Sequence, residues 1–245
     1  MSQVKKFSRL ISFFIIGSFI LAIYGCSQPA VISAVGPDGT LTILKPDESF
    51  THALESGRMV ILGDPPPASL ILTQHESIPI LKFSSTGSNF SIVRPIEANL
   101  MATPYLDWSW NMADHDTPYH GVSLMVGIIA PEGSPNEYSP SMAPHIKGTP
   151  AANRIISIQW SKFALERGHL MPHPVLSANA VTYVARGGSE NARQWWRESI
   201  DLSNLYARSW PGEDLTKSKI VFIALVAKDL QEGSPAYFSE IKLFR

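Results

Sequence analysis

The side chains best suited to chemistry gather in one short segment. Asp114, His115 and Asp116 lie in sequence, with Asp107 and His120 nearby. Carboxylates and imidazoles this close along a chain can coordinate a divalent ion. The flanking proline and glycine are equally typical of a solvated loop, which is the interpretation we favour. We therefore predict no metal site and no cofactor, and retain Asp107, Asp114 and His115 as candidate ligand-binding residues.

A tryptophan pair supplies the second candidate. In a strand, successive side chains point to opposite faces, so Trp195 shares a face with Arg197, Ser199 and Asp201 while Trp196 points inward. A flat aromatic ring beside hydrogen-bonding groups can stack on a sugar ring, and the same pattern would suit a tryptophan that covers a sheet edge. Trp195 and Arg197 are therefore candidate ligand-binding residues.

Signatures of common enzyme classes are missing from the sequence. It contains no Gly-x-Gly-x-x-Gly, no Walker loop, no Gly-x-Ser-x-Gly elbow and no His-Glu-x-x-His. Serine or carboxylate-pair chemistry stays open, because such groups meet in space rather than along the chain. We assign no catalytic residue, and the pattern favours a binding protein over an enzyme.

The N-terminus has the layout of a secretory signal. Three basic residues and no acid precede the uncharged apolar stretch 10–24. As a helix that stretch would reach about 22 Å, short of the roughly 30 Å hydrocarbon core of a bilayer. It ends in Ile23-Tyr24-Gly25-Cys26, which resembles a lipobox, and Cys26 is the only cysteine of the chain.

We therefore expect residues 1–25 to be removed as a signal peptide and Cys26 to carry acyl chains such as palmitate. Several acyl chains bind a membrane more strongly than a single acyl chain, whose affinity is marginal. Ser27 follows the cysteine, where an aspartate would resemble an inner-membrane retention signal. The expected location is the outer membrane, with the protein facing the periplasm.

Charge and length limit the mature chain further. Loss of the three N-terminal basic residues leaves 17 Lys and Arg against 21 Asp and Glu, which gives no support to a nucleic-acid partner. About 220 residues can build one substantial core. We expect residues 68–245 to form one domain, preceded at 26–67 by a lipid-proximal segment that is either a partly structured linker or an edge addition to the domain.

Short apolar runs separated by 19 prolines and 16 glycines predict strands rather than long helices. Residues 105–112 alternate as a half-buried strand, whereas 122–130 and 220–227 are apolar on both faces. Two turns of helix are expected after Asp201, a short helix within 52–61, and a long loop over 131–152. The remaining predicted strands are a hairpin of 31–35 with 40–44, a hairpin of 78–83 with 90–93, a pair of 181–186 with 194–201, and strands at 155–160 and 237–244. This pattern predicts an all-β, two-sheet antiparallel β-sandwich with one or two short helices.

Four stretches, in this order, resemble the bacterial family known as domain of unknown function 3047 (DUF3047). They are 103–110 (TPYLDWSW), 155–160 (IISIQW), 193–201 (RQWWRESID) with the helix behind it, and 220–227 (IVFIALVA). The family's acidic run after the penultimate strand is replaced here by 228–235 (KDLQEGSP). The resemblance implies a jelly-roll sandwich like those of carbohydrate-binding modules, with no established activity.

Three functions remain open from the sequence. The first is a membrane-anchored module that binds a glycan or another envelope component through Trp195 and Arg197. The second is a hydrolase of envelope polysaccharide in which Asp107, Asp114 or His115 takes part. The third is a structural partner in an envelope assembly, which would expose a large apolar patch instead of a cleft.

Overall fold

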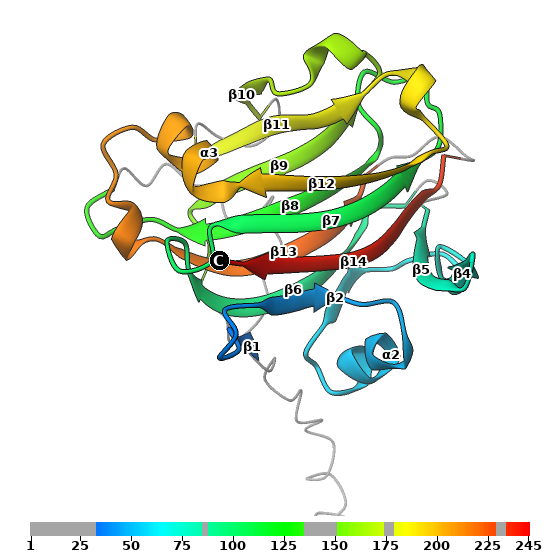
Figure 1. The fold of residues 1–245 in the computed structure, drawn as a ribbon, viewed down its shortest axis with the longest axis horizontal. Helices are drawn as coiled ribbons and strands as arrows, with labels where there is room; N and C mark the ends of the chain where they lie inside the picture. The colour runs from blue at the N-terminus through cyan, green and yellow to red at the C-terminus, as the bar shows by residue number, and fades with distance from the viewer. Residues whose placement is uncertain (1–32, 85–87, 135–150, 174–178, 229–233) are drawn as a thin grey trace, which may run out of the picture.

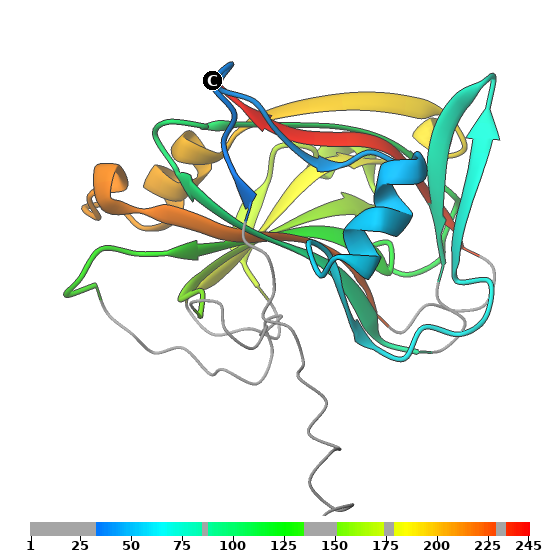
Figure 2. The same ribbon diagram turned by 90° about the horizontal axis from the view of Figure 1, so that it is seen from below.

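The computed structural model describes residues 33–84, 88–134, 151–173, 179–228 and 234–245. Cys26 and most of the predicted loop 131–152 lie outside these ranges. Two sheets pack face to face (Figures 1 and 2), which confirms the all-β two-sheet sandwich. Among the described residues, no helix is both long and apolar enough to cross a membrane.

The larger sheet has eight strands in the described part of the chain. Their order is β1 (Ser33–Ala34), β6 (Phe90–Asn99), β13 (Lys219–Ala227), β8 (Val122–Ile129), β9 (Arg154–Ser161), β11 (Ala180–Gly187) and β10 (Leu170–Pro172), with β3 (Val60–Gly63) also pairing with β6. The pairs β1 with β6 and β9 with β11 are parallel, and the other pairs are antiparallel.

The smaller sheet carries six described strands. Their order is β12 (Trp195–Asp201), β7 (Tyr105–Met112), β14 (Ala236–Phe244), β5 (Ile78–Phe83) and β4 (Leu70–His75), with β2 (Leu41–Leu44) also pairing with β14. Both sheets thus take in strands from the segment before residue 68, namely β2 in the smaller sheet and β1 and β3 in the larger. Helix α2 (Glu48–Glu55) connects β2 and β3.

The predicted hairpins are wrong, although the strands in them exist. β5 and β6 lie in different sheets, as do β11 and β12, and β1 and β2. Alternating polarity and turn residues identify a strand and its end, but an apolar face is buried equally well in either sheet of a sandwich. The chain uses these connections to cross between the sheets.

The interior between the sheets is built around three tryptophans, as predicted. Trp108 and Trp110 of β7 and Trp160 of β9 are at most 1% exposed. The Trp110 ring lies edge-on to both others, at centroid distances of 5.3 and 5.6 Å. Such edge-to-face contacts add to the large apolar area that each ring buries.

Strands β8 and β13 are buried on both faces, as their apolar sequences predicted. One face packs between the sheets, and the other belongs to a second apolar cluster that includes Met125, Val221 and Phe222. Gly127 makes room for this cluster, because a Cβ there would lie 2.1 Å from the Phe222 ring. Helix α3 (Leu202–Ser209) begins at the predicted cap, where the Asp201 carboxylate accepts a hydrogen bond from the Asn204 amide.

The β4–β5 hairpin leaves the plane of the smaller sheet. β5 pairs with β14 only through Leu81, Lys82 and Phe83, so the outer part of the hairpin stands off the sheet. Figure 2 shows it rising beside the other strands of this sheet. Its tight turn places both Glu76 and Ser77 at positive φ, as a two-residue hairpin turn with the twist of the strands requires.

Candidate functional site

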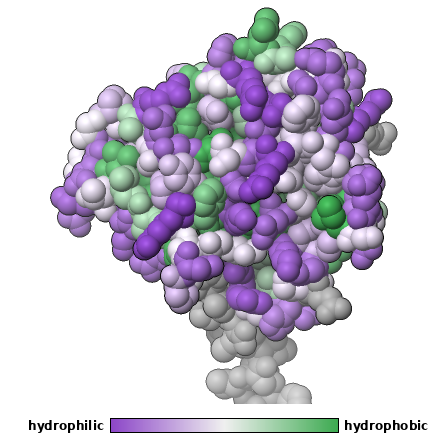
Figure 3. All heavy atoms as spheres, viewed as in Figure 1, coloured by the Kyte–Doolittle hydropathy of each residue, from purple (hydrophilic) through white to green (hydrophobic). Residues whose placement is uncertain are grey.

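The outward-pointing side chains of the smaller sheet form rows across its strands, a surface we call the outer face. Opposite residues of antiparallel neighbours lie side by side. At one end, Trp195 of β12, Asn111 of β7 and Tyr237 of β14 form a row that continues to Lys82 of β5. Figure 3 looks onto this face, where hydrophilic side chains surround smaller apolar patches.

Two further rows follow along the strands. Ser199, Asp107 and Lys242 lie opposite one another. At the far end, Tyr105 lies opposite Phe244, and their rings stack with centroids 5.4 Å apart. The outer face therefore has aromatic side chains at both ends and polar ones between them.

The aromatic end borders a hollow of about 580 Å³, here called the aromatic hollow. Trp195 and Tyr237 form part of its floor, and both are half-buried. The β4–β5 hairpin forms a wall, and its His75 ring lies 5.9 Å from the Trp195 ring at an interplanar angle of 35°. Asp114 also lines this hollow, together with Asn111. Ring faces and hydrogen-bonding groups thus border one space.

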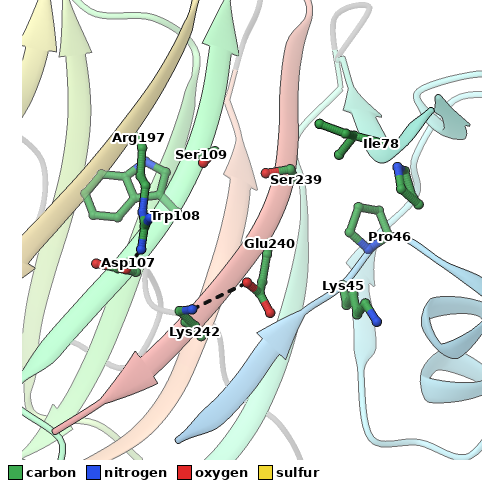
Figure 4. Close-up of a pocket in the computed structure, with 11 residues that line it drawn as sticks. Lys45, Pro46, Ile78, Asp107, Trp108, Ser109, Arg197, Ser239, Glu240 and Lys242 are labelled. Carbon is green, nitrogen blue, oxygen red and sulfur yellow. Dashed lines mark hydrogen bonds and ion pairs between the residues drawn. The ribbon is translucent and has the colours of Figure 1, made fainter. Parts of the chain in front are cut away.

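A second space of about 370 Å³, the polar hollow, lies further along the outer face (Figure 4). Its lining residues are Lys45, Pro46, Ile78, Pro79, Asp107, Trp108, Ser109, Arg197, Ser239, Glu240 and Lys242. They come from β5, β7, β12 and β14 and from the two residues that follow β2, so the sheet order brings them together. Ile78 and Pro79 give the hollow an apolar wall.

An ion pair occupies the floor of the polar hollow. Arg197 Nη2 donates to Asp107 Oδ2 at 2.8 Å, and this hydrogen bond raises the pKa of the Arg197 guanidinium. Asp107 is 5% exposed although it points outward, whereas 71% of the Arg197 side chain is exposed. Asp107 Oδ1 is buried and has no hydrogen-bond partner among the described residues.

The structure brings four of the five sequence-derived ligand-binding candidates to the outer face. Trp195 and Asp114 line the aromatic hollow, and Arg197 and Asp107 line the polar hollow. His115 is not among the described residues that line either space. The alternation in β12 also predicted that Trp196 points inward. Its Nε1–H donates to the Asn191 carbonyl.

His115 packs instead against His120, with ring centroids 5.1 Å apart. Burial lowers the pKa of His115, and it lowers the pKa of His120 to about 3. No three His, Cys, Asp or Glu side chains of the described ranges converge as a metal site would require. The imidazoles therefore form a neutral, packed pair beside the outer face.

Sequence reasoning missed several residues that line the two hollows. Strict alternation over 236–244 would put Tyr237 on the opposite face from Glu240 and Lys242, and the irregularity of β14 between Phe238 and Ile241 brings all three to the outer face. The sequence pattern does not indicate which strands would pair with the strand that carries these residues. His75 carried no signal, because its place depends on the hairpin leaving the sheet.

Comparisons with known proteins give similarity of fold only. No protein-family model matches the chain, and no curated protein matches it. Among solved structures, a family 11 carbohydrate-binding module from Clostridium thermocellum, in complex with a β-1,3-1,4-mixed-linked tetrasaccharide, is 12% identical with a TM-score of 0.41. That match covers 86% of this chain and 97% of the module.

Two further solved structures are similar at the same level. A protein of unknown function with a galectin-like fold from Bacillus subtilis is 8% identical, with a TM-score of 0.45, and the match covers 83% of this chain and 94% of that protein. A thermostable cellulase derived from Cel12A of Rhodothermus marinus is 12% identical, with a TM-score of 0.43 and coverage of 76% and 92%.

Proposed function

We propose that this protein is a glycan-binding module of the cell envelope, and that its outer face is the binding surface. The observation that carries the proposal is the row of Trp195 and Tyr237, half-buried aromatic side chains with Asn111 between them. A ring whose face is accessible can stack on the apolar face of a sugar, while a neighbouring amide can both donate and accept hydrogen bonds.

The outer face also suits an extended ligand. From Asn111 to Tyr105 the strand β7 advances by six residue steps, or about 20 Å at a rise of about 3.4 Å per residue. Polar side chains occupy the middle of this length, and the stacked rings of Tyr105 and Phe244 lie at its end. An oligosaccharide of several units could contact aromatic rings at both ends and hydrogen-bonding groups between them.

The location in the envelope is part of the same proposal. It is supported by the basic and apolar signal segment that ends at Cys26. With lipid on Cys26, the domain begins only a few residues from the membrane, because β1 starts at Ser33. A module held there would meet polymers of the cell envelope on the side of the membrane that faces the periplasm.

The test is a glycan array read together with thermal melts. Trp195→Ala should weaken glycan binding by about 1 to 3 kcal/mol, or roughly 5- to 150-fold, with little change in melting temperature. Trp196→Ala is the matched control on the inward side, where the ring packs on the Arg186 guanidinium at 3.7 Å. That variant should instead lose roughly 3 to 5 kcal/mol of stability.

Other results would contradict the proposal. The proposal is wrong if the wild-type protein binds no glycan. It is also wrong if the Trp195→Ala variant melts far below the wild type but binds glycan with wild-type affinity. Release of new reducing ends from a bound glycan would support the hydrolase alternative instead, since cleavage creates one reducing end for each bond broken.

A further inference from the structure

We propose that Asp107 is a specificity-determining residue, and that the polar hollow selects a neutral sugar with adjacent hydroxyl groups over an anionic one. This inference rests on the glycan-binding function proposed above and names the class of glycan. Its starting point is the carboxylate at the floor of the hollow, which points outward and is nevertheless buried.

The carboxylate of Asp107 is only half used by the protein. Oδ2 accepts from Arg197, but Oδ1 has no partner among the described residues. An ionised carboxylate can only accept hydrogen bonds, so the missing group must be a donor. Leaving a buried charged group short of a hydrogen bond is costly, and such groups in folded proteins call for an explanation. A ligand hydroxyl that donates to Oδ1 would explain why this oxygen has no partner in the described part of the chain.

Because Oδ1 is buried, a ligand hydroxyl can reach it only if a neighbouring side chain moves aside. Arg197 lies beside Asp107 with most of its length in solvent, and Lys242 is directly opposite Asp107 on β14. Arg197 can move more readily than Lys242, whose side chain is only 29% exposed, because a packed side chain has already lost rotamer freedom. A small displacement of either can open a path for a hydroxyl from the hollow to the carboxylate.

The charges of the hollow argue against an anionic ligand. Each of its three cations is already paired: Lys45 with Asp47 at 3.1 Å, Arg197 with Asp107 at 2.8 Å, and Lys242 with Glu240 at 3.6 Å. A uronate or phosphate would need to displace one of these carboxylates and would lie close to Asp107 and Glu240. Like charges at such distances are unfavourable.

Adjacent hydroxyl groups fit the same arrangement. One hydroxyl can donate to Asp107 Oδ1, while its neighbour accepts from an N–H of Arg197, a residue that only donates. The hydroxyls of Ser109 and Ser239 add groups that can donate or accept. Ile78, 56% exposed, and Pro79 offer an apolar wall to the carbon–hydrogen face of a sugar ring.

Isothermal titration with named tetrasaccharides tests this inference. The probes are the neutral β-1,4-glucan, β-1,4-mannan and α-1,4-glucan tetramers, and the anionic tetragalacturonate. The wild type should bind at least one neutral tetramer and not tetragalacturonate. Asp107→Asn should weaken that binding by roughly 10- to 100-fold, because the neutral amide has one oxygen: turned to Arg197, it leaves an NH2 group towards the ligand in place of a charged acceptor.

A melting curve separates this role from a structural one. Asp107→Asn should melt at or above the wild-type temperature, because it removes a buried and incompletely paired charge whose ionic partner is mostly exposed. Glu97→Gln is the control, since Glu97 is an exposed acid of the larger sheet that pairs with Lys219 at 3.1 Å. It should change neither binding nor melting temperature.

Four outcomes would overturn the inference. Unchanged neutral-sugar binding by Asp107→Asn, alongside a loss in Trp195→Ala, would overturn it and leave the proposed function standing. A lower melting temperature with unchanged binding would make Asp107 purely structural, and a preference of the wild type for tetragalacturonate would reverse the selectivity. Binding to none of the tetramers would contradict the neutral-sugar class, and binding to nothing on the wider array would contradict the proposed function as well.

Discussion

A buried ion pair joins the two sheets, and removing one of its partners should destabilise the fold strongly. Arg186 of β11 in the larger sheet donates from Nε to Glu198 Oε1 of β12 in the smaller sheet at 2.5 Å. Both residues are less than 9% exposed. Arg167 adds a longer contact of 3.4 Å from a largely exposed position. The Arg186 guanidinium also covers the Trp196 ring.

Replacing Glu198 by Leu would leave the Arg186 charge between the sheets without its carboxylate, and among the described residues the face of Trp196 would remain beside it. Breaking a buried pair in this way costs about 3 to 5 kcal/mol. In a domain of this size each kcal/mol lowers the melting temperature by about 2 to 4 °C, so we expect a fall of roughly 6 to 20 °C. Glu198→Leu combined with Arg186→Met should recover most of this loss, because neither charge is then desolvated.

Urea unfolding monitored by tryptophan fluorescence would measure these free energies in the two single variants and the double variant. The exposed pair of Glu97 and Lys219 is the control, and Glu97→Leu should cost less than about 1 kcal/mol. A cost of less than about 1 kcal/mol for Glu198→Leu would refute the reasoning. So would a double variant whose cost equals the sum of the two single losses, because the ion pair would then have no coupling energy.

Three further predictions concern the anchor, the second apolar cluster and pH. Cys26→Ala should abolish incorporation of labelled palmitate. Incorporation of label by that variant would mean that the lipid is attached to another residue. Gly127→Ala should cost about 1 to 3 kcal/mol, because the added Cβ would meet the Phe222 ring at 2.1 Å; an unchanged urea midpoint would contradict this. Burial holds the pKa of His120 at about 3 in the folded state against an ordinary 6.5, so the unfolded chain takes up the proton first and stability should fall as pH decreases from about 6.5 towards 3. His120→Gln should make that fall shallower, and an equally steep urea-midpoint profile would contradict the assignment.

Much of the fold was predictable because strand periodicity is local. The alternation in 105–112 and the unbroken apolar run of 220–227 give both the strands and their burial. The sheet to which each strand belongs was not predictable, because the apolar face of a strand is buried equally well in either sheet of a sandwich. That is why β5 and β6, separated by a short turn-rich segment, were expected to pair and instead belong to different sheets.

The candidate site shows the same limit. Trp195 and Arg197 could be assigned to one face from period two alone, and Asp107 to the outward side of its own strand. Their meeting depends on the register of β12 against β7, in which Ser199 lies opposite Asp107. His115 adjoins Asp114 in sequence, yet it packs on His120 because a loop residue has no fixed face to share with its neighbour.

The position of β14 has a consequence for biogenesis. This strand lies between β7 and β5 and also pairs with β2, so it is an interior strand of the sheet that carries the outer face. Its Tyr237 lies opposite Asn111, 126 positions earlier, and pairings this distant in sequence form slowly. Until residues 236–244 have joined the sheet, β7 and β5 each retain a bare edge that can pair with another chain. A product truncated before β14 should therefore lack the central strand of the outer face, with Tyr237 and Lys242, and be prone to aggregate.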